Sequence, residues 1–243
     1  MQKDRLLRAF GFAERISRRK DMAAAATDIG ELARDYGFST YILAAFTGPG
    51  SLVDPYILSS GWNEEWQDRY FSKDYVLDDP TVARALRSFS PFKWGDTKSD
   101  PGVSDRGKQI LEEARSFDMK DGVFIPVHGP RGFEGTLVFG GEEADVGSED
   151  LKALHLAGLY AYSHVLDLAK PKIPSLGRET VLTKRETECI KWSAVGKTSS
   201  DIAELLGISR HTADWYLKEA TRKLGAANRT HAVAAAFRTG LIT

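Results

Sequence analysis

The 243-residue sequence is poor in cysteine and contains no long apolar run. Cys189 is its single cysteine, so no disulfide can form within the chain. No apolar stretch approaches the roughly 20 residues that cross a bilayer. The first ten residues lack the apolar segment and cleavage site of a signal peptide. These absences argue against a disulfide-stabilised secreted protein and a membrane protein, and we expect a cytoplasmic protein.

The motifs of common enzyme classes are also missing. The sequence has no G-x-S-x-G and no dinucleotide fingerprint. His128, His155 and His164 lack the spacing of metal ligands. Gly196-Lys197-Thr198 resembles the end of a phosphate-binding P-loop, but that loop needs a glycine where Lys191 stands. We therefore predict that the protein is not an enzyme and has no metal or cofactor.

Charge is distributed unevenly along the chain, although its net charge is only −1. From residue 171 onward there are 12 Lys and Arg against 7 Asp and Glu, whereas the preceding part has 21 against 27. A basic segment joined to an acidic body indicates that the C-terminal part meets a polyanion.

Residues 170–178 contain two prolines and a glycine, which interrupt the helical pattern before them. We predict a linker there, between domains at 1–169 and 179–243. In the first domain we expect Leu6, Leu7, Phe10 and Ala13 to form the buried stripe of the first helix.

The first domain alternates between helical and strand-like patterns. Helices are predicted at 4–18, 21–36, 104–116 and 148–169, and strands at 38–46, 122–128 and 134–139. Because strands bracketed by helix pairs favour helices on both faces of a sheet, we predict an α-β-α sandwich with an antiparallel sheet. The second domain is predicted to be all-α with four helices, which makes the chain α+β.

Helix start signals are sharp in the second domain. Thr183 and Glu186 have the spacing of a capping box. A second helix is predicted to open at 198–201, with Ile202, Ala203, Leu205 and Leu206 buried. Ser209 is expected to cap a third helix.

The third helix has two opposite stripes at helical spacing. One is apolar and suits packing: Ala213, Tyr216, Leu217, Ala220 and Leu224. The other is polar and suits a DNA major groove, although the solvated face of a small helical bundle has the same periodicity. With the first turn, the expected DNA-binding residues are Ser209, Arg210, His211, Thr212, Asp214, Trp215, Lys218 and Arg222.

The residue types at particular positions favour DNA binding over a solvated helix face. Leu182-Thr183, Arg185-Glu186, Gly196-Lys197, Asp201-Ile202-Ala203, Lys223-Leu224 and Asn228-Arg229 resemble the DNA-binding domain of LuxR-type regulators. Ala213 and Tyr216 depart from the usual valine and histidine of that family, and both fall on the packing stripe. Asp214 stands where relatives often have a cation, which alters the expected base preference, since Asp accepts from cytosine.

Aromatic residues and an aspartate are concentrated in the first domain. Trp62, Trp66 and Tyr70 are four apart, which would place them on one helix face, and Asp79 and Trp94 follow. An aromatic core stripe has the same spacing, but two indoles and a phenol bring polar groups that need partners when buried. Such a set suits a pocket for a small ligand with an apolar body and a few amide or ester groups.

This stretch resembles the autoinducer-binding domain of the LuxR family. The resemblance implies that Trp66 donates to the lactone carbonyl of an acyl-homoserine lactone and that Asp79 accepts from its amide N–H. Tyr70, Trp94 and Val138 would line the pocket. Relatives often have tyrosine in place of Trp62, and an indole can still donate to the acyl carbonyl. Gly122 also matches a glycine typical of the family.

We therefore predict a quorum-sensing transcriptional regulator of the LuxR type. It would bind the lactone and a palindromic promoter element of double-stranded DNA as a homodimer, with RNA polymerase as a further partner. Two alternatives remain: a receptor for a different small molecule, and a DNA-binding protein whose first domain binds a protein. The rings clustered at 62–94 also predict a compact space for the acyl group: Trp62, Tyr70, Phe71, Tyr75, Phe89, Phe92 and Trp94.

Overall fold

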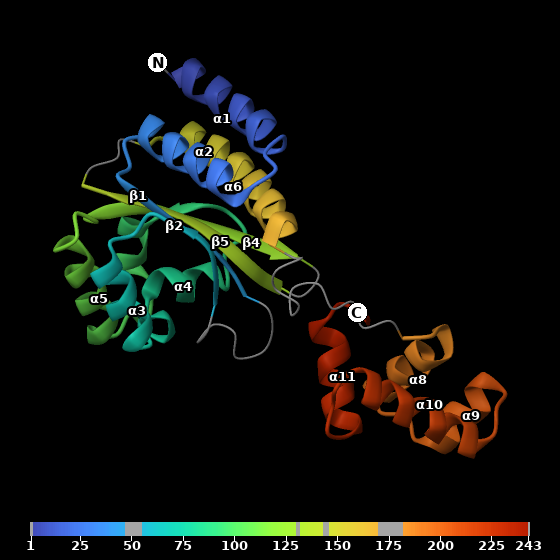
Figure 1. Ribbon diagram of the computed structural model, residues 1–243. Coiled ribbons are helices and arrows are strands. Elements are labelled where there is room, and N and C mark those ends of the chain that lie inside the picture. The colour runs from blue at the N-terminus through green and yellow to red at the C-terminus, as the bar shows by residue number, and fades with distance from the viewer. Residues whose placement is uncertain (1, 47–54, 130–131, 143–145, 170–181, 243) are drawn as a thin grey trace. The chain divides into compact units, whose positions relative to one another are not determined.

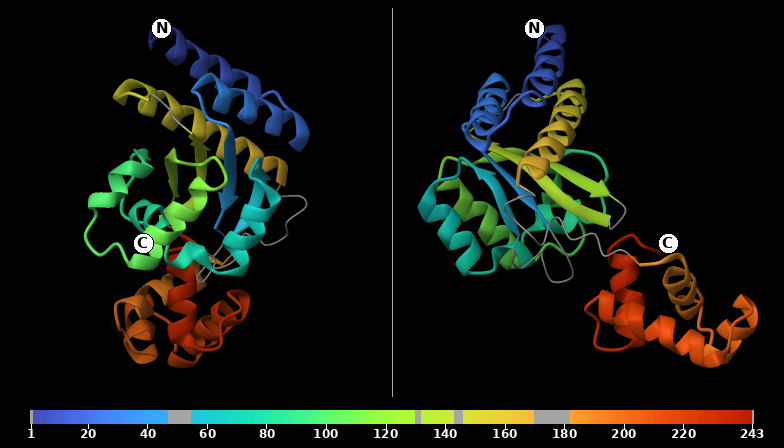
Figure 2. Two further views of the ribbon diagram at one scale, coloured as in Figure 1. Left: turned by 90° about the vertical axis from the view of Figure 1, so that its left-hand side faces the viewer. Right: turned by 45° about the vertical axis from the view of Figure 1, so that its right-hand side comes forward.

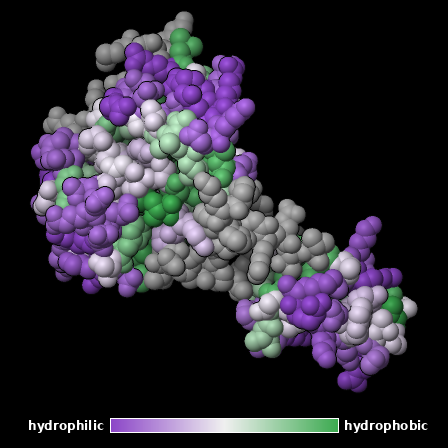
Figure 3. All heavy atoms as spheres, in the orientation of Figure 1, coloured by the Kyte–Doolittle hydropathy of each residue, from purple (hydrophilic) through white to green (hydrophobic). Residues whose placement is uncertain are grey.

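The computed structural model describes residues 2–46, 55–129, 132–142, 146–169 and 182–242. Two compact units divide the chain, Met1–Gly177 and Arg178–Thr243. The linker predicted at 170–178 lies outside the described residues. Hydrophilic residues predominate on the face drawn in Figure 3. Within the described ranges, no helix combines the length and the apolar character that a membrane span needs.

A five-stranded antiparallel sheet forms the centre of the first unit. Its order is β2-β1-β5-β4-β3. The strands are β1 Thr40–Ala45, β2 Tyr56–Ser60, β3 Phe92–Lys93, β4 Asp121–Gly129 and β5 Gly132–Gly141. The three predicted strands are present as β1, β4 and β5, whereas the sequence pattern did not predict β2 and β3.

Helices cover both faces of this sheet, as predicted (Figures 1 and 2). On one face lie α1 Gln2–Ile16, α2 Met22–Asp35 and α6 Ser148–Ala169. On the other lie α3 Glu64–Ser72, α4 Pro80–Ala85 and α5 Asp105–Arg115, with short 3₁₀ turns at Tyr75–Leu77 and Trp94–Ser99. These two helical layers and the sheet between them make the α-β-α sandwich.

Alternation along the strands divides the interior into two apolar cores. In β1, Leu43 belongs to the core under α1, α2 and α6, whereas Ile42 belongs to the core under α3–α5. In β5, Phe139 and Val138 divide in the same way. Because neighbouring side chains of a strand point to opposite faces, the sheet supplies a wall to the second core, where the candidate ligand site lies.

The predicted stripe of α1 is wrong for two of its residues. Leu7 and Phe10 are 62% and 53% exposed, whereas Phe12 and Ile16 are fully buried. Ala13 is buried as expected. The stripe that contains Leu7 and Phe10 and the stripe that contains Phe12 and Ile16 are both apolar at helical spacing. Periodicity alone therefore did not identify the face that packs against α2 and α6.

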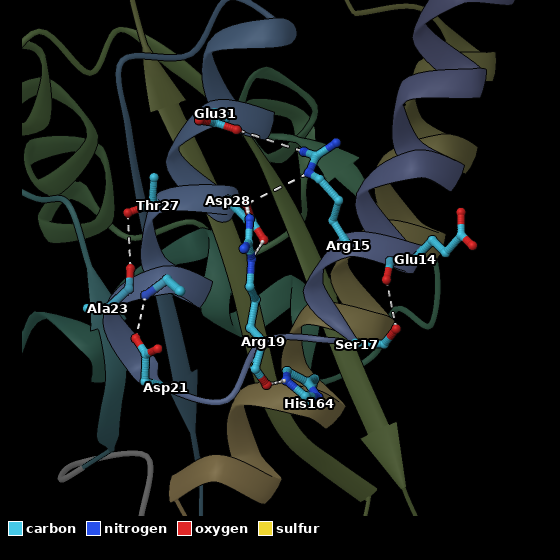
Figure 4. Close-up of polar contacts among 11 residues, drawn as sticks. Glu14, Arg15, Ser17, Arg19, Asp21, Ala23, Thr27, Asp28, Glu31 and His164 are labelled. Carbon is cyan, nitrogen blue, oxygen red and sulfur yellow. Dashed lines mark hydrogen bonds and ion pairs between the residues drawn. The ribbon is translucent and has the colours of Figure 1, made fainter.

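A charged contact fixes the turn between α1 and α2 (Figure 4). Arg19 donates through Nε and Nη2 to both oxygens of Asp28, at 2.7 and 2.8 Å. The hydrogen bond from Arg19 lowers the pKa of the buried Asp28 carboxyl. Nε2 of His164, on α6, lies 2.8 Å from the carbonyl oxygen of Arg19. The turn is thereby held to both neighbouring helices.

The second unit contains α8 Lys184–Ala194, α9 Ser199–Leu206, α10 Arg210–Lys223 and α11 Arg229–Arg238. Side chains cap each of them at its N-terminus, and the predicted capping box of Thr183 and Glu186 is present. Gly207 ends α9 at φ +63°, a conformation that glycine adopts without strain. Leu205, expected to be buried, is 50% exposed because α9 packs through Ile202 and Ala203.

Candidate ligand pocket and nucleic-acid interface

A largely apolar pocket lies between the sheet and α3–α5. All six predicted ligand residues line it: Trp62, Trp66, Tyr70, Asp79, Trp94 and Val138. The other lining residues are Ile42, Ala44, Phe46, Pro55, Phe71, Val76, Thr81, Val82, Ile110, Leu111, Ala114, Met119, Phe124 and Thr136. The sequence pattern therefore identified the polar centre of the pocket and missed most of its apolar wall.

Helix α3 places Trp66 and Tyr70 one turn apart toward the pocket. Asn63 caps the helix by accepting from the backbone N–H of Glu65 at 2.9 Å. Trp62 precedes this cap, so its predicted place on the helix is wrong. Its ring still reaches the same cluster, edge-on to Tyr70 with centroids 5.3 Å apart. The three side chains meet although only two of them share a helix.

Asp79 is the buried polar centre of the site. Its Oδ1 accepts from the backbone N–H and the hydroxyl of Thr81, at 2.8 and 2.7 Å, which caps α4. Its Oδ2 accepts from the hydroxyl of Tyr70 at 2.8 Å. The backbone N–H of Val82 also lowers the pKa of this carboxyl. Oδ2 accepts from the hydroxyl of Tyr70, and a carboxylate oxygen has about two acceptor positions. One more donor can therefore be accommodated at Oδ2 of Asp79.

The surroundings shift the pKa of both partners. Burial raises the pKa of Asp79, and hydrogen bonds from Thr81 and Tyr70 oppose that rise. Burial, followed by the negative charge of Asp79, raises the pKa of Tyr70 well above its ordinary value. Tyr70 therefore keeps its proton and remains a donor to the carboxylate.

Three indole N–H groups in the pocket have no hydrogen-bond partner among the residues that the structure describes. They are the Nε1 atoms of Trp62, Trp66 and Trp94, all buried without a hydrogen bond. Buried donors left unpaired cost about 1–3 kcal/mol each, and native structures contain few of them. Three in one pocket indicate that a bound molecule supplies acceptors.

Gly122 makes room for Trp94. A Cβ on Gly122 would lie 2.2 Å from the carbonyl oxygen of Phe139 and 2.5 Å from Cε2 of Trp94. Both distances are shorter than real Cβ contacts, so a side chain there would displace the strand or the indole. This explains in physical terms why glycine stands at a position that the sequence resemblance had singled out.

Most of the apolar wall comes from residues that sequence reasoning did not assign to a site, and Val138 is the exception. Ile42, Phe124 and Val138 are register partners on three adjacent strands and form the sheet side of the pocket. Thr136 donates to the carbonyl oxygen of Ile125 at 3.1 Å, so its hydroxyl proton is occupied. The available signal was strand alternation, but both faces of these strands are apolar, which left the pocket face undefined.

The aromatic cluster divides between the pocket and its surroundings. Trp62, Tyr70, Phe71 and Trp94 line the pocket. Phe92 stacks on Phe124, and Phe89 is 72% exposed. Tyr75 is not among the lining residues: its hydroxyl donates to Glu113 at 2.9 Å, and its ring packs against Trp66. Four of the seven clustered rings therefore bear on the space open to a ligand.

In the second unit, α10 presents one polar face to solvent. Its packing residues Ala213, Leu217 and Ala220 are buried. Thr212 is partly buried and shares a hydrogen bond of 2.8 Å with Ser209, the helix cap. The remaining predicted DNA-binding residues are exposed: Ser209, Arg210, His211, Asp214, Trp215, Lys218 and Arg222.

The cationic side chains of this face differ in whether they already contact an acidic side chain. Glu219 accepts from Arg222 at 2.8 and 3.1 Å, and this hydrogen bond raises the pKa of the Arg222 guanidinium. Asp214 lies 3.9 Å from Nε of Arg210. Lys218 has no ion pair or hydrogen bond to any residue that the structure describes. Lys218 is therefore available to an external anion without breaking a contact.

The described residues contain no group of three His, Cys, Asp or Glu side chains that could hold a metal ion. Cys189 is fully buried in the core of the second unit. Together, an apolar pocket with a buried polar centre and a separate helical unit with an exposed polar helix define a class: regulators that couple a small molecule to nucleic-acid binding.

Comparisons with known proteins agree with that class. Residues 21–165 match the family described as autoinducer binding domain, and residues 180–236 match the bacterial regulatory proteins of the luxR family. The transcriptional activator protein BjaR1 of Bradyrhizobium diazoefficiens is 35% identical over 85% of this chain and 84% of its own. RpaR of Rhodopseudomonas palustris, a quorum sensing-dependent transcriptional regulator, is 32% identical over 97% and 95%.

Solved structures share the fold. SdiA of Escherichia coli superposes with a TM-score of 0.73 at 23% identity, over 97% of this chain and 98% of that one. SdiA in complex with octanoyl-rac-glycerol gives 0.74, also at 23% identity, over 96% and 94%. The chain belongs to the LuxR family: it is a quorum-sensing transcriptional regulator with an autoinducer-binding domain and a helix-turn-helix domain.

Proposed function

We propose that the first unit binds an acyl-homoserine lactone and that the second binds a palindromic promoter element. The observation that carries the ligand assignment is the set of unpaired indole N–H groups beside Asp79 in an apolar pocket. An acyl-homoserine lactone has two carbonyl acceptors, one amide donor and an apolar tail. These groups match the donors, the acceptor and the wall of the pocket.

Each polar group of the ligand has a partner in this proposal. Trp66 donates to the lactone carbonyl, and Asp79 accepts from the amide N–H at its remaining acceptor position. Trp62 donates to the acyl carbonyl, where relatives often use a tyrosine hydroxyl. The ring of Trp94 and the side chain of Val138 enclose the ligand.

The acyl group is short, branched or aromatic in this proposal. Large rigid rings of Trp62, Phe71 and Trp94 line the pocket, and they leave less room than leucine or alanine would. An aryl acyl group could also gain about 0.5–1.5 kcal/mol from ring contacts. A titration of straight, branched and aryl lactones tests this. A lower half-maximal concentration for twelve-carbon straight tails would contradict it.

DNA binding is assigned to α10, with its exposed face in the major groove. A single helix contacts only a few base pairs, whereas a two-fold dimer reads two half-sites one helical turn apart. We therefore propose a homodimer that acts in the cytoplasm and contacts RNA polymerase at the promoter. Helices α1 and α6 pack against each other. Their exposed apolar residues favour a protein contact there: Leu7, Phe10, Leu159 and Tyr160.

Selection of DNA from a random pool tests the second half of the proposal. The full-length protein, expressed with a lactone and without one, should recover a two-fold symmetric sequence. Affinity for that sequence should change with the lactone, because a ligand that favours one conformational state shifts its population. Recovery of no preferred sequence in either state would contradict the DNA assignment.

A further inference from the structure

Two aromatic rings outside the ligand pocket pack against Trp66. The ring of Tyr75 lies 6.2 Å from that of Trp66, and the ring of Phe117 lies 5.4 Å from it, centroid to centroid. Trp66 lines the pocket, whereas neither Tyr75 nor Phe117 is among the lining residues. The two rings therefore limit how the indole can move without contacting a ligand themselves.

Tyr75 follows a left-handed residue. Helix α3 ends at Ser72, and Asp74 takes φ +53°, a conformation that Asp adopts more readily than most residues. Tyr75 is only 4% exposed, and its ring also lies edge-on to Tyr70 with centroids 6.0 Å apart. It therefore contacts two residues of α3 that line the pocket, Trp66 and Tyr70, without lining the pocket itself.

One carboxylate holds both rings. Oε2 of Glu113, on α5, accepts from the hydroxyl of Tyr75 at 2.9 Å and lies 3.7 Å from Nη1 of Arg69. The guanidinium carbon of Arg69 lies over the ring of Phe117, 5.2 Å from its centroid. Glu113 thus fixes Tyr75 directly and Phe117 through Arg69.

The surroundings of Glu113 favour its ionised form. Burial raises the pKa of its carboxyl, whereas hydrogen bonds from Tyr75 and Gln109 lower it. The charges of Lys73 and Arg69 lower it further, and the pKa lies below its ordinary value. Hydrogen bonds to an ionised acceptor are stronger than those between neutral groups. Since Glu113 is not among the pocket residues, any effect of this carboxylate on a ligand passes through its neighbours.

We propose that Glu113 is a positioning residue for ligand binding: it holds Tyr75 and Arg69 so that the indole N–H of Trp66 points at the ligand. The inference rests on the proposed donation from Trp66 to the lactone carbonyl. Because this N–H has no hydrogen-bond partner among the described residues, packing alone orients the indole. A side chain that its neighbours already hold loses less freedom on binding. Glu113 thereby contributes to the recognition of a carbonyl that it does not touch.

The test compares two ligands that differ at one carbonyl. The first is the lactone that binds most tightly among the straight, branched and aryl ones. The second is the amide of 3-aminotetrahydrofuran with the same acyl group, whose ring has CH₂ in place of the lactone carbonyl. Full-length wild-type protein should bind the lactone about tenfold more tightly, because the tetrahydrofuran leaves the N–H of Trp66 unpaired.

Glu113→Ala should lose most of this preference. Calorimetric titration should show weaker binding of the lactone and a wild-type affinity for the tetrahydrofuran, which has no carbonyl at that position. Tyr75→Phe removes only the hydroxyl that donates to Glu113, and it should reduce the preference in the same direction with a smaller change in packing. It keeps the comparison open if the alanine variant does not fold.

Two further substitutions and one double variant separate positioning from stability. Glu113→Gln keeps an oxygen that accepts from Tyr75 but loses the charge, so it should restore part of the preference. Glu112→Gln is the matched control: it removes a neighbouring carboxylate that pairs with Arg115 at the surface, and it should keep the wild-type preference. In a Trp66→Phe background there is no N–H to position, so Glu113→Ala should cost no further lactone affinity.

Several results would contradict the proposal. If Glu113→Ala or Tyr75→Phe weakens both ligands by the same factor, the carboxylate only stabilises the fold. An unchanged lactone preference in both variants would also overturn the proposal, as would an equal loss with and without the Trp66 N–H. A wild type that binds the two ligands equally would show that Trp66 does not read the carbonyl, and the inference would be wrong with it. A wild type that binds no lactone would instead overturn the proposed function itself.

Discussion

The hydroxyl of Tyr70 donates to Oδ2 of Asp79 across 2.8 Å, inside the pocket of the first unit. The bond joins α3 to the cap of α4, so it fixes the carboxylate that the proposed ligand amide meets. Thr81 occupies the other oxygen. The orientation of Asp79 is therefore set by the protein before any ligand arrives, which reduces the ordering cost of binding.

Tyr70→Phe should raise the pKa of Asp79 and weaken lactone binding. The hydrogen bond from Tyr70 lowers that pKa against the effect of burial, so its removal leaves burial less opposed. Lactone affinity in the wild type should decline as pH falls through the pKa of Asp79, because the ionised carboxylate is the stronger acceptor. In Tyr70→Phe the decline should begin at higher pH, which lactone titrations at a series of pH values measure. Superimposable pH profiles would show that the contact does not tune Asp79.

Gly122→Ala should destabilise the first unit and disturb the pocket. The added Cβ would lie 2.2 Å from a strand carbonyl, so backbone or indole must shift at a cost of about 1–3 kcal/mol. Gly95→Ala is the matched control, because a Cβ there meets nothing within 4 Å. Thermal unfolding of both variants is the measurement. Equal melting temperatures would contradict the crowding at Gly122.

Arg19→Ala should lower the free energy of unfolding more than Arg18→Ala does, since it removes both hydrogen bonds from the Arg19 guanidinium to the buried Asp28. Arg18→Ala removes an exposed i,i+4 pair with Glu14 and should cost no more than about 0.5 kcal/mol. Denaturant unfolding of the two variants makes the comparison.

The pH dependence of the Arg19 effect has a definite sign. The folded pKa of Asp28 lies below its unfolded value, so the stabilisation is present above the unfolded pKa. It is lost as pH falls through the folded pKa. The stability difference between wild type and Arg19→Ala should therefore shrink in acid. A difference that grows toward low pH would contradict this assignment.

Lys218→Ala should weaken DNA binding without affecting folding, because Lys218 is exposed and has no ion pair to the described residues. A base-edge contact would cost about 1–3 kcal/mol and depend on sequence. Arg222→Ala should have a smaller effect, since Arg222 must first leave Glu219. Fluorescence anisotropy with the selected duplex compares them. Wild-type affinity in both variants would mean that another helix contacts DNA.

Local signals in the sequence predicted the second unit well. The capping box of Thr183 and Glu186 and the Ser209 cap depend on residues three apart, and both are present as predicted. The first unit was harder for a physical reason. Both faces of its strands and two stripes of α1 are apolar, so only tertiary packing decides that Phe12 is buried and Phe10 exposed.

The candidate site, too, was predicted where local sequence decides and not where tertiary packing decides. Residue type and spacing identified Trp66, Tyr70 and Asp79, which share one small region of sequence. On the sheet wall, the family resemblance supplied Val138 alone. Ile42 and Phe124 were out of reach, since they meet Val138 through strand pairing over long sequence separation. The start of α3 also differs, because Asn63 caps the helix after Trp62. That the indole N–H groups find no partner among the described residues follows only from the folded structure.

The central claim is that Asp79 and Trp66 hold an acyl-homoserine lactone in the pocket. Mass spectrometry of material extracted from protein expressed with a mixture of lactones tests it most directly. Wild-type protein should retain one lactone in about equimolar amount. Asp79→Ala and Trp66→Phe should retain about tenfold to a hundredfold less, since each leaves a ligand polar group unpaired at about 1–3 kcal/mol. Retention of no lactone by the wild type, or equal retention by all three proteins, would contradict the account.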